Sequence, residues 1–341
     1  MLKLSIIIPV YNVEDYIAST VKSLFDQHDS AVEYIFIDDC GSDNSWQVLE
    51  DTLRQYPECA QSSKLIRLPH NGGVENARLN GLAQATGEYI WFVDSDDLIA
   101  AGAIKAILDS LAKNPVDYLA ITLQLLPEKG SIASLQDSIV CKQISPEYLF
   151  TEIIGYNGKH GTVCNIVKRQ LTLQYPMLKT GLKIAEDYVM HCCWSIFAES
   201  AAVLKNPVYG YVKRPQSVMR KSKSQEVMTA TRHSLQLLTD FSKTLPECKQ
   251  KLFCEALRIV TVKMRMLFFI SIFNNYKQDE IAMLMRYQIP AKYSLVNDFY
   301  KLPFELQPML VCDRFQWYNL MRCYVKFGMA LVTLKRKIRW F

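Results

Sequence analysis

Three carboxylates lie within four residues, directly after a short run of large apolar side chains. The apolar run is residues 89–93, and the carboxylates are Asp94, Asp96 and Asp97. A run of β-forming residues without a polar break is typical of a strand buried on both faces. The carboxyl ends of such strands form the edge at which α/β sheets bind ligands, and Mg²⁺ and Mn²⁺ prefer oxygen ligands. The pattern therefore predicts a divalent-metal site; the alternative is that Asp96 or Asp97 caps a helix that begins near Gly102.

A second pair of carboxylates, Asp38 and Asp39, follows another apolar run at residues 32–37. If both runs are parallel strands of one sheet, the two acidic groups lie at the same edge. This arrangement indicates nucleotide binding. The sequence has no Gly-x-Gly-x-x-Gly after the first expected strand and no Gly-Lys-Ser/Thr phosphate loop, so it is typical neither of a dehydrogenase nor of a P-loop enzyme.

Strands and helices are expected to alternate around these residues, with short connections between them. The expected strands are residues 4–10, 32–37, 64–68, 89–93, 116–123 and 208–212. Pro9 is expected to help end the first of them. The expected helices in this part are residues 14–27, 46–56, 74–85 and 102–113. The alternation predicts an α/β fold in which helices cover both faces of a parallel sheet and the crossovers are right-handed.

The composition is that of a globular protein of 341 residues, 50% hydrophobic and 21% charged. The net charge is +5, and no acidic residue follows Asp313, so the excess lies in the tail and no nucleic-acid partner is expected. The ten cysteines show no Cys-x-x-Cys pair, which favours reduced thiols in a cytoplasmic protein. No uncharged apolar run approaches ~18 residues and no signal peptide is evident, so an integral membrane protein is not expected.

Four stretches of the chain closely resemble the motifs of the family 2 glycosyltransferases. They occur in the family's order and spacing: residues 5–12 (SIIIPVYN), 37–45 (IDDCGSDNS), 71–81 (NGGVENARLNG) and 87–97 (GEYIWFVDSDD). The resemblance covers roughly the first 125 residues. It implies a GT-A fold, meaning a mostly parallel sheet flanked by helices, and a nucleotide-diphosphate sugar donor. It also implies a divalent metal, Mn²⁺ or Mg²⁺, and inversion at the anomeric carbon.

The resemblance also implies which residues bind the nucleotide. Pro9 and Tyr11 are similar to the loop that packs against the base, and Asp38 or Asp39 would accept a hydrogen bond from the base imide. Arg78 would reach the base or the diphosphate. An aromatic face with one carboxylate suits a uracil ring, so a UDP-linked sugar is expected. By itself, Arg78 could equally be a surface cation of a helix.

The acidic stretch after the fourth expected strand carries the metal-binding roles that the resemblance implies. Asp96 would be the principal metal ligand, with Asp97 beside it, and Asp94 would contact the ribose or the metal. Ser95 is assigned to the donor site. A metal ion and an arginine together would neutralise the charge that develops on a diphosphate leaving group.

A second group of candidate residues begins near residue 156. Glu186 and Asp187 open a helical run and resemble the family's acidic pair, in which the aspartate acts as general base. Asp187 would take the proton from the acceptor hydroxyl, and Glu186 would orient or bind the acceptor. Both could instead be ordinary acids of a helix N-terminus. Arg214 and Ser217, in a basic loop, would close over the diphosphate or form a solvated charged segment.

The resemblance ends near residue 225, and periodicity predicts helices at about 225–243, 247–272 and 278–286. A final helix would carry an apolar stripe with basic neighbours: Leu320, Tyr324, Phe327, Leu331, Leu334, Ile338 and Phe341. It could bind an anionic membrane surface, dock on its own domain or form a homodimer seam. The expected domains are 1–222, with a donor half at 1–125 and an acceptor half at 126–222, and a helical region at 223–341.

The sequence thus predicts a metal-dependent, inverting hexosyl- or N-acetylhexosaminyltransferase. It would act in the cytoplasm, peripheral to the inner face of the cell membrane. The acceptor would be a hydroxyl of a glycan or glycolipid, as in lipopolysaccharide, capsule or exopolysaccharide synthesis. Two alternatives stay open, a polyprenyl-phosphate sugar synthase and a non-catalytic nucleotide-sugar-binding module.

Overall fold

The computed structural model describes residues 4–135, 139–154, 162–175, 179–182, 185–214, 224–275 and 307. The chain divides into two compact units, Met1–Lys221 and Ser222–Phe341. The assignment of residues 1–222 to a catalytic domain and of 223–341 to a separate helical region stays a prediction. Within the described residues, no helix reaches the length and hydropathy that crossing a membrane requires.

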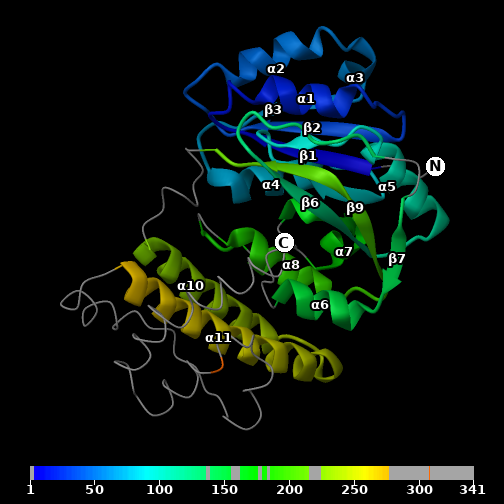
Figure 1. Ribbon diagram of the computed structural model, residues 1–341. Helices are drawn as coiled ribbons and strands as arrows, with labels where there is room; N and C mark the ends of the chain where they lie inside the picture. The colour runs from blue at the N-terminus through cyan, green and yellow to red at the C-terminus, as the bar shows by residue number, and fades with distance from the viewer. Residues whose placement is uncertain are drawn as a thin grey trace, which may run out of the picture. The chain divides into compact units, whose positions relative to one another are not determined.

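The first unit is built on one sheet in the order β3-β2-β1-β4-β8-β6-β9-β5, with β7 paired to β9 (Figure 1). Its strands are β1 (Leu4–Val10), β2 (Val32–Asp38), β3 (Ser63–Arg67), β4 (Tyr89–Phe92), β5 (Leu98–Ile99), β6 (Tyr118–Leu126), β7 (Cys141–Ile144), β8 (Asn165–Lys168) and β9 (Ala201–Val212). Its helices are α1 (Ile17–Phe25), α2 (Ser45–Leu53), α3 (Pro57–Gln61), α4 (Gly73–Gln84), α5 (Ala103–Lys113), α6 (Pro146–Ile154), α7 (Arg169–Gln174) and α8 (Glu186–Ser195). A 3₁₀ turn, Thr162–Cys164, precedes β8.

The sheet is parallel only in part, which corrects the sequence-based expectation. Strands β3, β2, β1 and β4 are parallel as expected. Strand β8 then lies between β4 and β6 and is antiparallel to both. The sequence did not predict β8 because its four residues are too few for a clear periodicity. The carboxyl ends of β1, β2 and β4 still meet at one edge, which is where the acidic residues follow.

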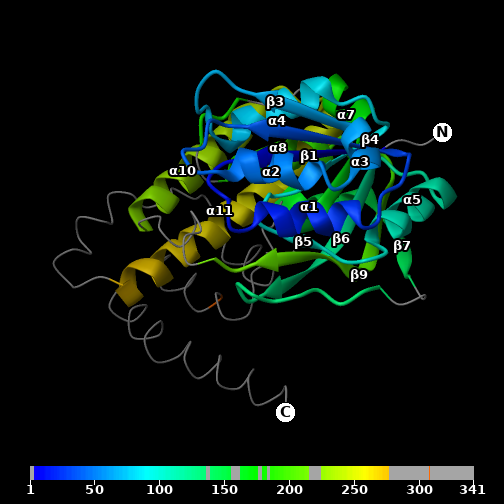
Figure 2. The same ribbon diagram turned by 90° about the horizontal axis from the view of Figure 1, so that it is seen from above.

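Helices cover both faces of this parallel portion. Alternate residues of β1, such as Ile6 and Ile8, join the core formed with α1, α2 and α5. Helix α4 lies on the other face, against Ile7. Figure 1 shows α1 and α2 on one side of β1 and β2 with α4 on the opposite side, and Figure 2 looks onto α1 and α2 from above.

Strand β1 continues through Pro9, which was expected to help end it. Pro9 is buried and stands opposite Ile37 of β2. The carbonyl of Ile7 accepts the Val93 N–H at 3.0 Å, on the side of β4. Backbone groups two residues apart in a strand point to the same side, so the nitrogen of Pro9 also faces the side of β4. The pairing of β1 with β4 ends at Ile7, before Pro9 is reached. The missing N–H of proline therefore costs no ladder bond.

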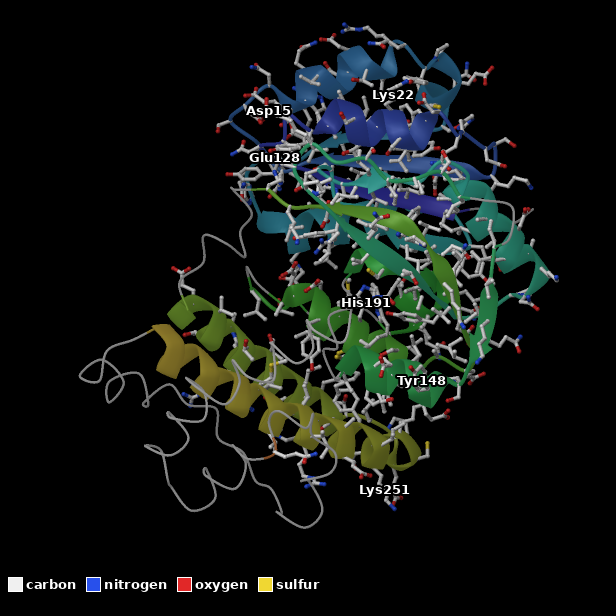
Figure 3. The ribbon with its side chains drawn as sticks, in the orientation of Figure 1. Asp15, Lys22, Glu128, Tyr148, His191 and Lys251 are labelled. Atoms are coloured by element: carbon white, nitrogen blue, oxygen red, sulfur yellow. The ribbon has the colours of Figure 1, made fainter. Side chains whose placement is uncertain are left out.

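Helix α6 packs against α8, and the Trp194 indole of α8 donates to the carbonyl of Tyr175, which follows α7. Figure 3 labels His191 of α8, which is 1% exposed and bonded to the hydroxyl of Tyr118. In the second unit, α10 (Ser224–Ser242) and α11 (Glu247–Asn275) confirm two of the expected C-terminal helices. They pack through Phe241 and Phe253, whose ring centroids are 5.5 Å apart. The helices expected at 278–286 and after Leu320 lie outside the described residues.

Candidate functional site

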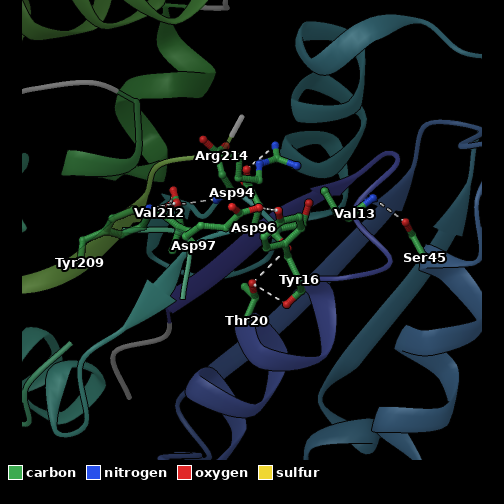
Figure 4. A network of polar contacts seen from close by, with 12 residues as sticks. Val13, Tyr16, Thr20, Ser45, Asp94, Asp96, Asp97, Tyr209, Val212 and Arg214 are labelled. Atoms are coloured by element: carbon green, nitrogen blue, oxygen red, sulfur yellow. Dashed lines mark hydrogen bonds and ion pairs between the residues drawn. The ribbon is translucent and has the colours of Figure 1, made fainter. Parts of the chain in front are cut away.

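The acidic stretch after β4 forms a compact cluster of carboxylates. One ligand oxygen from each of Asp94, Asp96 and Asp97 lies within 4.8 Å of the others, and no other such group of three occurs in the described part of the chain. Asp94 and Asp96 are half-buried, and Asp97 is buried. Figure 4 shows the three side chains side by side at the end of β4. The expectation that β4 ends in gathered carboxylates is therefore confirmed.

Asp97 is tied to strand β9 through both of its oxygens. The Tyr209 hydroxyl donates to Oδ2 at 2.7 Å and the Val212 N–H donates to Oδ1 at 2.8 Å. The same hydroxyl accepts the Asp94 N–H at 3.1 Å (Figure 4). Burial, followed by the charges of Asp96 and Asp94, raises the pKa of Asp97 to about 8. Asp97 thus anchors the cluster to β9.

The alternative that Asp96 or Asp97 caps a helix is wrong. Helix α5 has Gly102 as its N-cap, with a left-handed φ of 87° and no side-chain cap hydrogen bond. The left-handed conformation at that position is readily adopted by glycine. Neither Asp96 nor Asp97 is therefore used as the cap of α5.

Asp96 is paired with Arg214, which lies two residues after the end of β9. The Arg214 guanidinium also lies 5.1 Å from the ring centroid of Tyr16. The Tyr16 hydroxyl in turn donates to Glu128 at 2.6 Å, which raises the pKa of Tyr16 to about 12. Burial and the charge of Asp94 raise the pKa of Asp96 to about 6, although Arg214 acts in the opposite direction. The Arg214 side chain is therefore paired at the acidic cluster, while residues 215–221 of the basic loop lie outside the described residues and its contact to a diphosphate stays a prediction.

The cluster has the chemistry of a divalent-cation site. Its ligand set is all carboxylate oxygen, which is the donor that Mg²⁺ and Mn²⁺ prefer. Like charges this close repel, and a cation between them removes the repulsion. The guanidinium at Asp96 shows that a positive group already finds a stable position there. Asp94 and Asp96 have the more accessible side chains and are the two best placed to hold an ion.

On the nucleotide side, the two candidate aspartates differ in their surroundings. Asp39 is buried, and its oxygens accept the N–H groups of Gly72 at 2.8 Å and Gly73 at 2.9 Å. Asp38 is more accessible; it accepts the Cys40 N–H at 3.0 Å. The structure therefore gives Asp39 a visible role in fixing the start of α4, while the base contact of either residue stays a prediction.

Tyr11 and Pro9, the two residues expected to pack against the base, differ in their exposure to solvent. Tyr11 is 47% exposed and lies just beyond β1, where a flat ligand could stack on it. Pro9 is buried inside β1. Pro9 was expected in a loop, and its position in the strand corrects that expectation. Ser95 is also buried, and its carbonyl accepts the Thr20 hydroxyl at 3.0 Å.

Arg78 joins the two halves of the site. Its guanidinium donates to Asp94 at 3.0 Å and to Glu186 at 2.8 Å, and the residue is only 4% exposed. Burial would lower the pKa of Arg78, but the carboxylates of Asp94, Glu186 and Asp187 outweigh burial and raise it. The alternative of a surface cation is therefore wrong.

A glycine brings α4 close enough for that contact. A Cβ placed on Gly81 would lie 2.3 Å from Cγ2 of Ile7 in β1. Isoleucine is stiff at χ1, so this methyl group cannot move away cheaply. Gly81 thus lets α4 lie directly on the sheet, with Arg78 within reach of the end of β4.

The acceptor-side acids occupy the first turn of α8. Ala185 precedes them with a left-handed φ of 68°, an unusual conformation for a residue with a Cβ. Glu186 is buried, and burial, followed by the charge of Asp187, raises its pKa to about 7 while Arg78 opposes the shift. Asp187 is half-buried and accepts the N–H of Tyr188 at 2.8 Å. Glu186 is therefore not a solvated acid of a helix N-terminus, because it is bonded to the same arginine, Arg78, that bonds to Asp94.

Four residues of this site were missed by the sequence analysis: Tyr16, Glu75, Glu128 and Tyr209. Glu75 could have been found, since it lies three residues before Arg78 and so on the same helix face. The other three come from segments whose proximity only the fold reveals. Ser217, the second candidate of the basic loop, lies outside the described residues.

Comparisons with known sequences agree with these motifs. The profile described as Glycosyl transferase family 2 matches residues 5–169. The chain is 39% identical over 183 residues to the putative teichuronic acid biosynthesis glycosyltransferase TuaG of Bacillus subtilis (strain 168), covering 53% of this chain and 69% of that protein. It is 28% identical over 219 residues to the poly(ribitol-phosphate) beta-N-acetylglucosaminyltransferase TarS of Staphylococcus aureus (strain Mu50 / ATCC 700699), covering 63% of this chain but only 36% of TarS.

Solved structures resemble the fold over almost the whole chain. Residues 1–349 of S. aureus TarS in complex with UDP-GlcNAc superpose with a TM-score of 0.69 at 22% identity, covering 96% of this chain and 92% of that one. The mannosyltransferase PcManGT from Pyrobaculum calidifontis, in complex with GDP-Man and Mn²⁺, gives 0.55 at 12% identity, with coverages of 95% and 84%. This likeness confirms the expected GT-A fold.

Proposed function

This chain belongs to glycosyltransferase family 2, and on that premise we propose that it transfers a sugar from a UDP-sugar to a hydroxyl group of a cell-wall glycan. One observation carries the proposal. Arg78 bonds at once to Asp94 of the acidic cluster and to Glu186 of the acceptor-side pair. One buried arginine therefore joins the carboxylate cluster to the acceptor-side pair, whose second member, Asp187, is the proposed general base.

UDP-GlcNAc is the first donor to test. The TarS structure is a complex with UDP-GlcNAc, and TarS is named as an N-acetylglucosaminyltransferase. In this chain, the exposed Tyr11 offers a face to a base and Asp38 lies at the same edge of the sheet. The buried Nε atoms of Arg78 and Arg214 find no hydrogen-bond partner among the described residues, so they are donors available to a diphosphate.

The proposed metal, Mn²⁺ or Mg²⁺, would be held by Asp94 and Asp96, while Asp97 keeps the stretch attached to β9. When bound, the ion neutralises the negative charge that develops on the leaving diphosphate. Arg214 would exchange its bond to Asp96 for contacts to the diphosphate oxygens. Arginine suits that role because its planar guanidinium binds phosphate with two parallel hydrogen bonds.

In the proposed reaction, Asp187 accepts the proton of the acceptor hydroxyl as the oxygen attacks the anomeric carbon. Attack from the face opposite the departing UDP inverts the configuration of that carbon. Glu186 does not need to titrate in this scheme. Its bond to Arg78 joins the first turn of α8 to Asp94, which supports the proposal that Asp187 acts beside the donor.

The acceptor is proposed from the relatives alone. TuaG is named for teichuronic acid biosynthesis and TarS for poly(ribitol-phosphate) modification. A hydroxyl of an anionic cell-wall polymer is therefore the acceptor class to test first, and lipopolysaccharide and capsule precursors are second.

The test is a screen of nucleotide sugars for metal-dependent release of nucleoside diphosphate. The turnover of the Asp187→Asn variant is then measured with the donor that the wild-type protein uses best. We expect UDP-GlcNAc to be turned over with Mn²⁺ and not with EDTA. Asp187→Asn should lower kcat by roughly 100-fold or more while UDP still binds, since general-base catalysis contributes 10²–10⁴-fold. Retained turnover in Asp187→Asn would favour a phosphate acceptor, which needs no base. A wild-type protein that binds UDP but turns over no donor would be a binding module.

A further inference from the structure

Glu75, in the first turn of α4, holds a segment that lies far away in the sequence. Its Oε1 accepts the Thr180 N–H at 2.7 Å and its Oε2 accepts the Gly181 N–H at 3.0 Å. The partners are separated from Glu75 by 105 and 106 residues. Glu75 is 9% exposed and Thr180 is 6% exposed, so water cannot easily replace either bond. A carboxylate that accepts two backbone N–H groups in such a place is a strong and directional contact.

The turn that Glu75 holds, residues 179–182, is called the clasped turn here, and its backbone is also fixed locally. Gly181 adopts a left-handed φ of 64°. The Thr180 hydroxyl accepts the Leu182 N–H at 3.0 Å, which closes the turn locally. Three successive N–H groups are thus bonded to side-chain oxygens. Only four residues separate Gly181 from Glu186, so the turn lies just before the acceptor-side acids.

Two anchors on one turn of α4 hold this part of the chain. Glu75 and Arg78 are three residues apart and lie on the same helix face. Glu75 bonds to residues 180 and 181, and Arg78 bonds to Glu186. The start of α4 is itself fixed, because Asp39 at the end of β2 accepts the N–H groups of Gly72 and Gly73. The first turn of α4 is therefore hydrogen-bonded on one side to Asp39 at the end of β2 and on the other to the turn that precedes Asp187.

We propose that Glu75 is a positioning residue, which fixes the turn at residues 179–182 to the donor-side helix and thereby sets the position of Asp187. The inference rests on the proposed function, in which Asp187 is the general base. Glu75 touches neither substrate in this account. It acts through the backbone of Thr180 and Gly181, and its contribution is to the rate of the chemical step and not to donor affinity.

The informative substitution is Glu75→Gln, which keeps the size of the side chain. Glutamine offers one acceptor oxygen and one NH₂ group, so it can satisfy one of the two N–H groups and must face the other with a donor. The turn then loses a contact, and a displacement of about 1 Å at a catalytic group can cost 10²-fold in rate. We expect kcat for UDP release, with water as acceptor, to fall by roughly 10- to 100-fold, while donor KM and UDP affinity change by less than about twofold.

The experiment pairs these kinetics with amide hydrogen exchange, which does not depend on activity. In Glu75→Gln the amides of Thr180 and Gly181 should exchange faster than in the wild-type protein, while those of β1 stay protected. Glu58→Gln, on the exposed surface of α3, is the matched control and should change neither quantity. Gly181→Ala is the second variant; it keeps Glu75 but strains the clasped turn, and should give the same split between kcat and UDP affinity.

Several results would overturn the proposal. Wild-type kcat in Glu75→Gln despite faster exchange would mean that the clasp only adds stability. Equal losses of kcat and UDP affinity would mean that Glu75 supports the donor site. If Glu75→Gln does not fold, Gly181→Ala decides between these outcomes in the same way. If the wild-type protein releases UDP from no donor, the proposed function fails. Unchanged exchange at residues 180 and 181 in Glu75→Gln would then still refute the structural link.

Discussion

At the residue scale, the site is defined by carboxylates whose partners differ. Asp97 is saturated by Tyr209 and Val212, Asp39 by two glycine N–H groups, and Asp96 by a single arginine. A carboxylate with both oxygens bonded to the protein acts mainly as an anchor. A carboxylate that is partly accessible and paired only with an arginine side chain can bind a ligand in place of, or beside, that arginine. This distinction separates the proposed metal ligands from the residues that hold them.

The anchoring role of Asp97 predicts the effect of Tyr209→Phe. The substitution removes the hydroxyl that donates to Asp97 and accepts from Asp94, and leaves a buried carboxylate short of one donor. We expect a loss of about 1–3 kcal/mol in the free energy of unfolding, together with weaker Mn²⁺ binding. Denaturant unfolding and calorimetric Mn²⁺ titration measure the two effects. Tyr148→Phe, at a side chain that is 55% exposed, is the control. Unaltered stability and Mn²⁺ affinity would contradict the anchoring role.

The identities of the candidate residues could be predicted from sequence, but their partners could not. Asp94, Asp96 and Asp97 were found because a buried strand and an acidic run are adjacent in the chain. The bonds of Arg78 to Glu186 and of Asp97 to Tyr209 join residues more than 100 positions apart. No local pattern reports such a pairing. For the same reason, the structural role of Asp39 and the clasp by Glu75 became visible only in the fold.

At the element scale, α4 is the helix on which the site depends. Its buried face is unusual, because it carries Glu75 and Arg78 beside Ala77 and Gly81. Each of the two charged residues binds a different segment of the acceptor side. A helix at residues 74–85 was expected between the turn at residues 71–73 and Gly87, but its buried charged face gives no apolar stripe. The sequence therefore located α4 without revealing what it connects.

The opposite end of the sheet is held by another carboxylate, Glu33 of β2. Its Oε1 accepts hydrogen bonds from Ser5 at 2.6 Å and from the N–H of Thr86 at 2.6 Å, and Lys64 lies 2.9 Å from Oε2. Burial alone would raise the pKa of Glu33, but these partners lower it to about 2. Glu33 therefore links β1 and β3 to the turn before β4.

This lowered pKa predicts an acid-dependent loss of stability. The folded protein binds the proton more weakly than the unfolded chain, so the contribution of Glu33 is complete above the ordinary value of 4.5 and disappears as pH falls towards about 2. Glu33→Gln should lower the free energy of unfolding at pH 7 by about 1–3 kcal/mol and flatten its pH dependence in that window. Urea unfolding from pH 7 to pH 3 measures both effects, with Glu58→Gln as the exposed control. Parallel curves for Glu33→Gln and the wild-type protein would contradict this account.

At the scale of the whole molecule, the predicted alternation gave the right fold class and the parallel half of the sheet. Strands β1, β2 and β4 could be predicted from their apolar stretches, whereas the short β3, with the sequence SKLIR, carries a weaker signal. Strands β5, β7 and β8 are two to four residues long, too short for a periodic signal. Their pairing with distant strands is determined by packing. Strands β6 and β9 were predicted in part, at residues 116–123 and 208–212, but the strand order and the antiparallel pairings of this half of the sheet could not be predicted.

The basic tail carries a prediction that comes from the sequence, since it lies outside the described residues. Truncation after Leu320 removes the expected apolar stripe and its basic neighbours. We expect the full chain to co-sediment with vesicles that contain anionic lipid and the truncated chain to remain in the supernatant, because charge and apolar area act together at such surfaces. Donor turnover in the absence of vesicles should not change. Equal co-sedimentation of the two chains would remove the membrane hypothesis and favour docking of the tail on protein.

The most direct test of the central claim is calorimetric UDP binding with and without Mn²⁺, in the wild-type protein and in Asp96→Asn. If Asp94 and Asp96 hold the ion that binds the diphosphate, Mn²⁺ should tighten UDP binding to the wild-type protein by at least about tenfold, which is 1.4 kcal/mol. Asp96→Asn should lose that gain and keep its fold. Equal UDP affinity with Mn²⁺ and with EDTA in the wild-type protein, or an undiminished Mn²⁺ effect in Asp96→Asn, would contradict the claim.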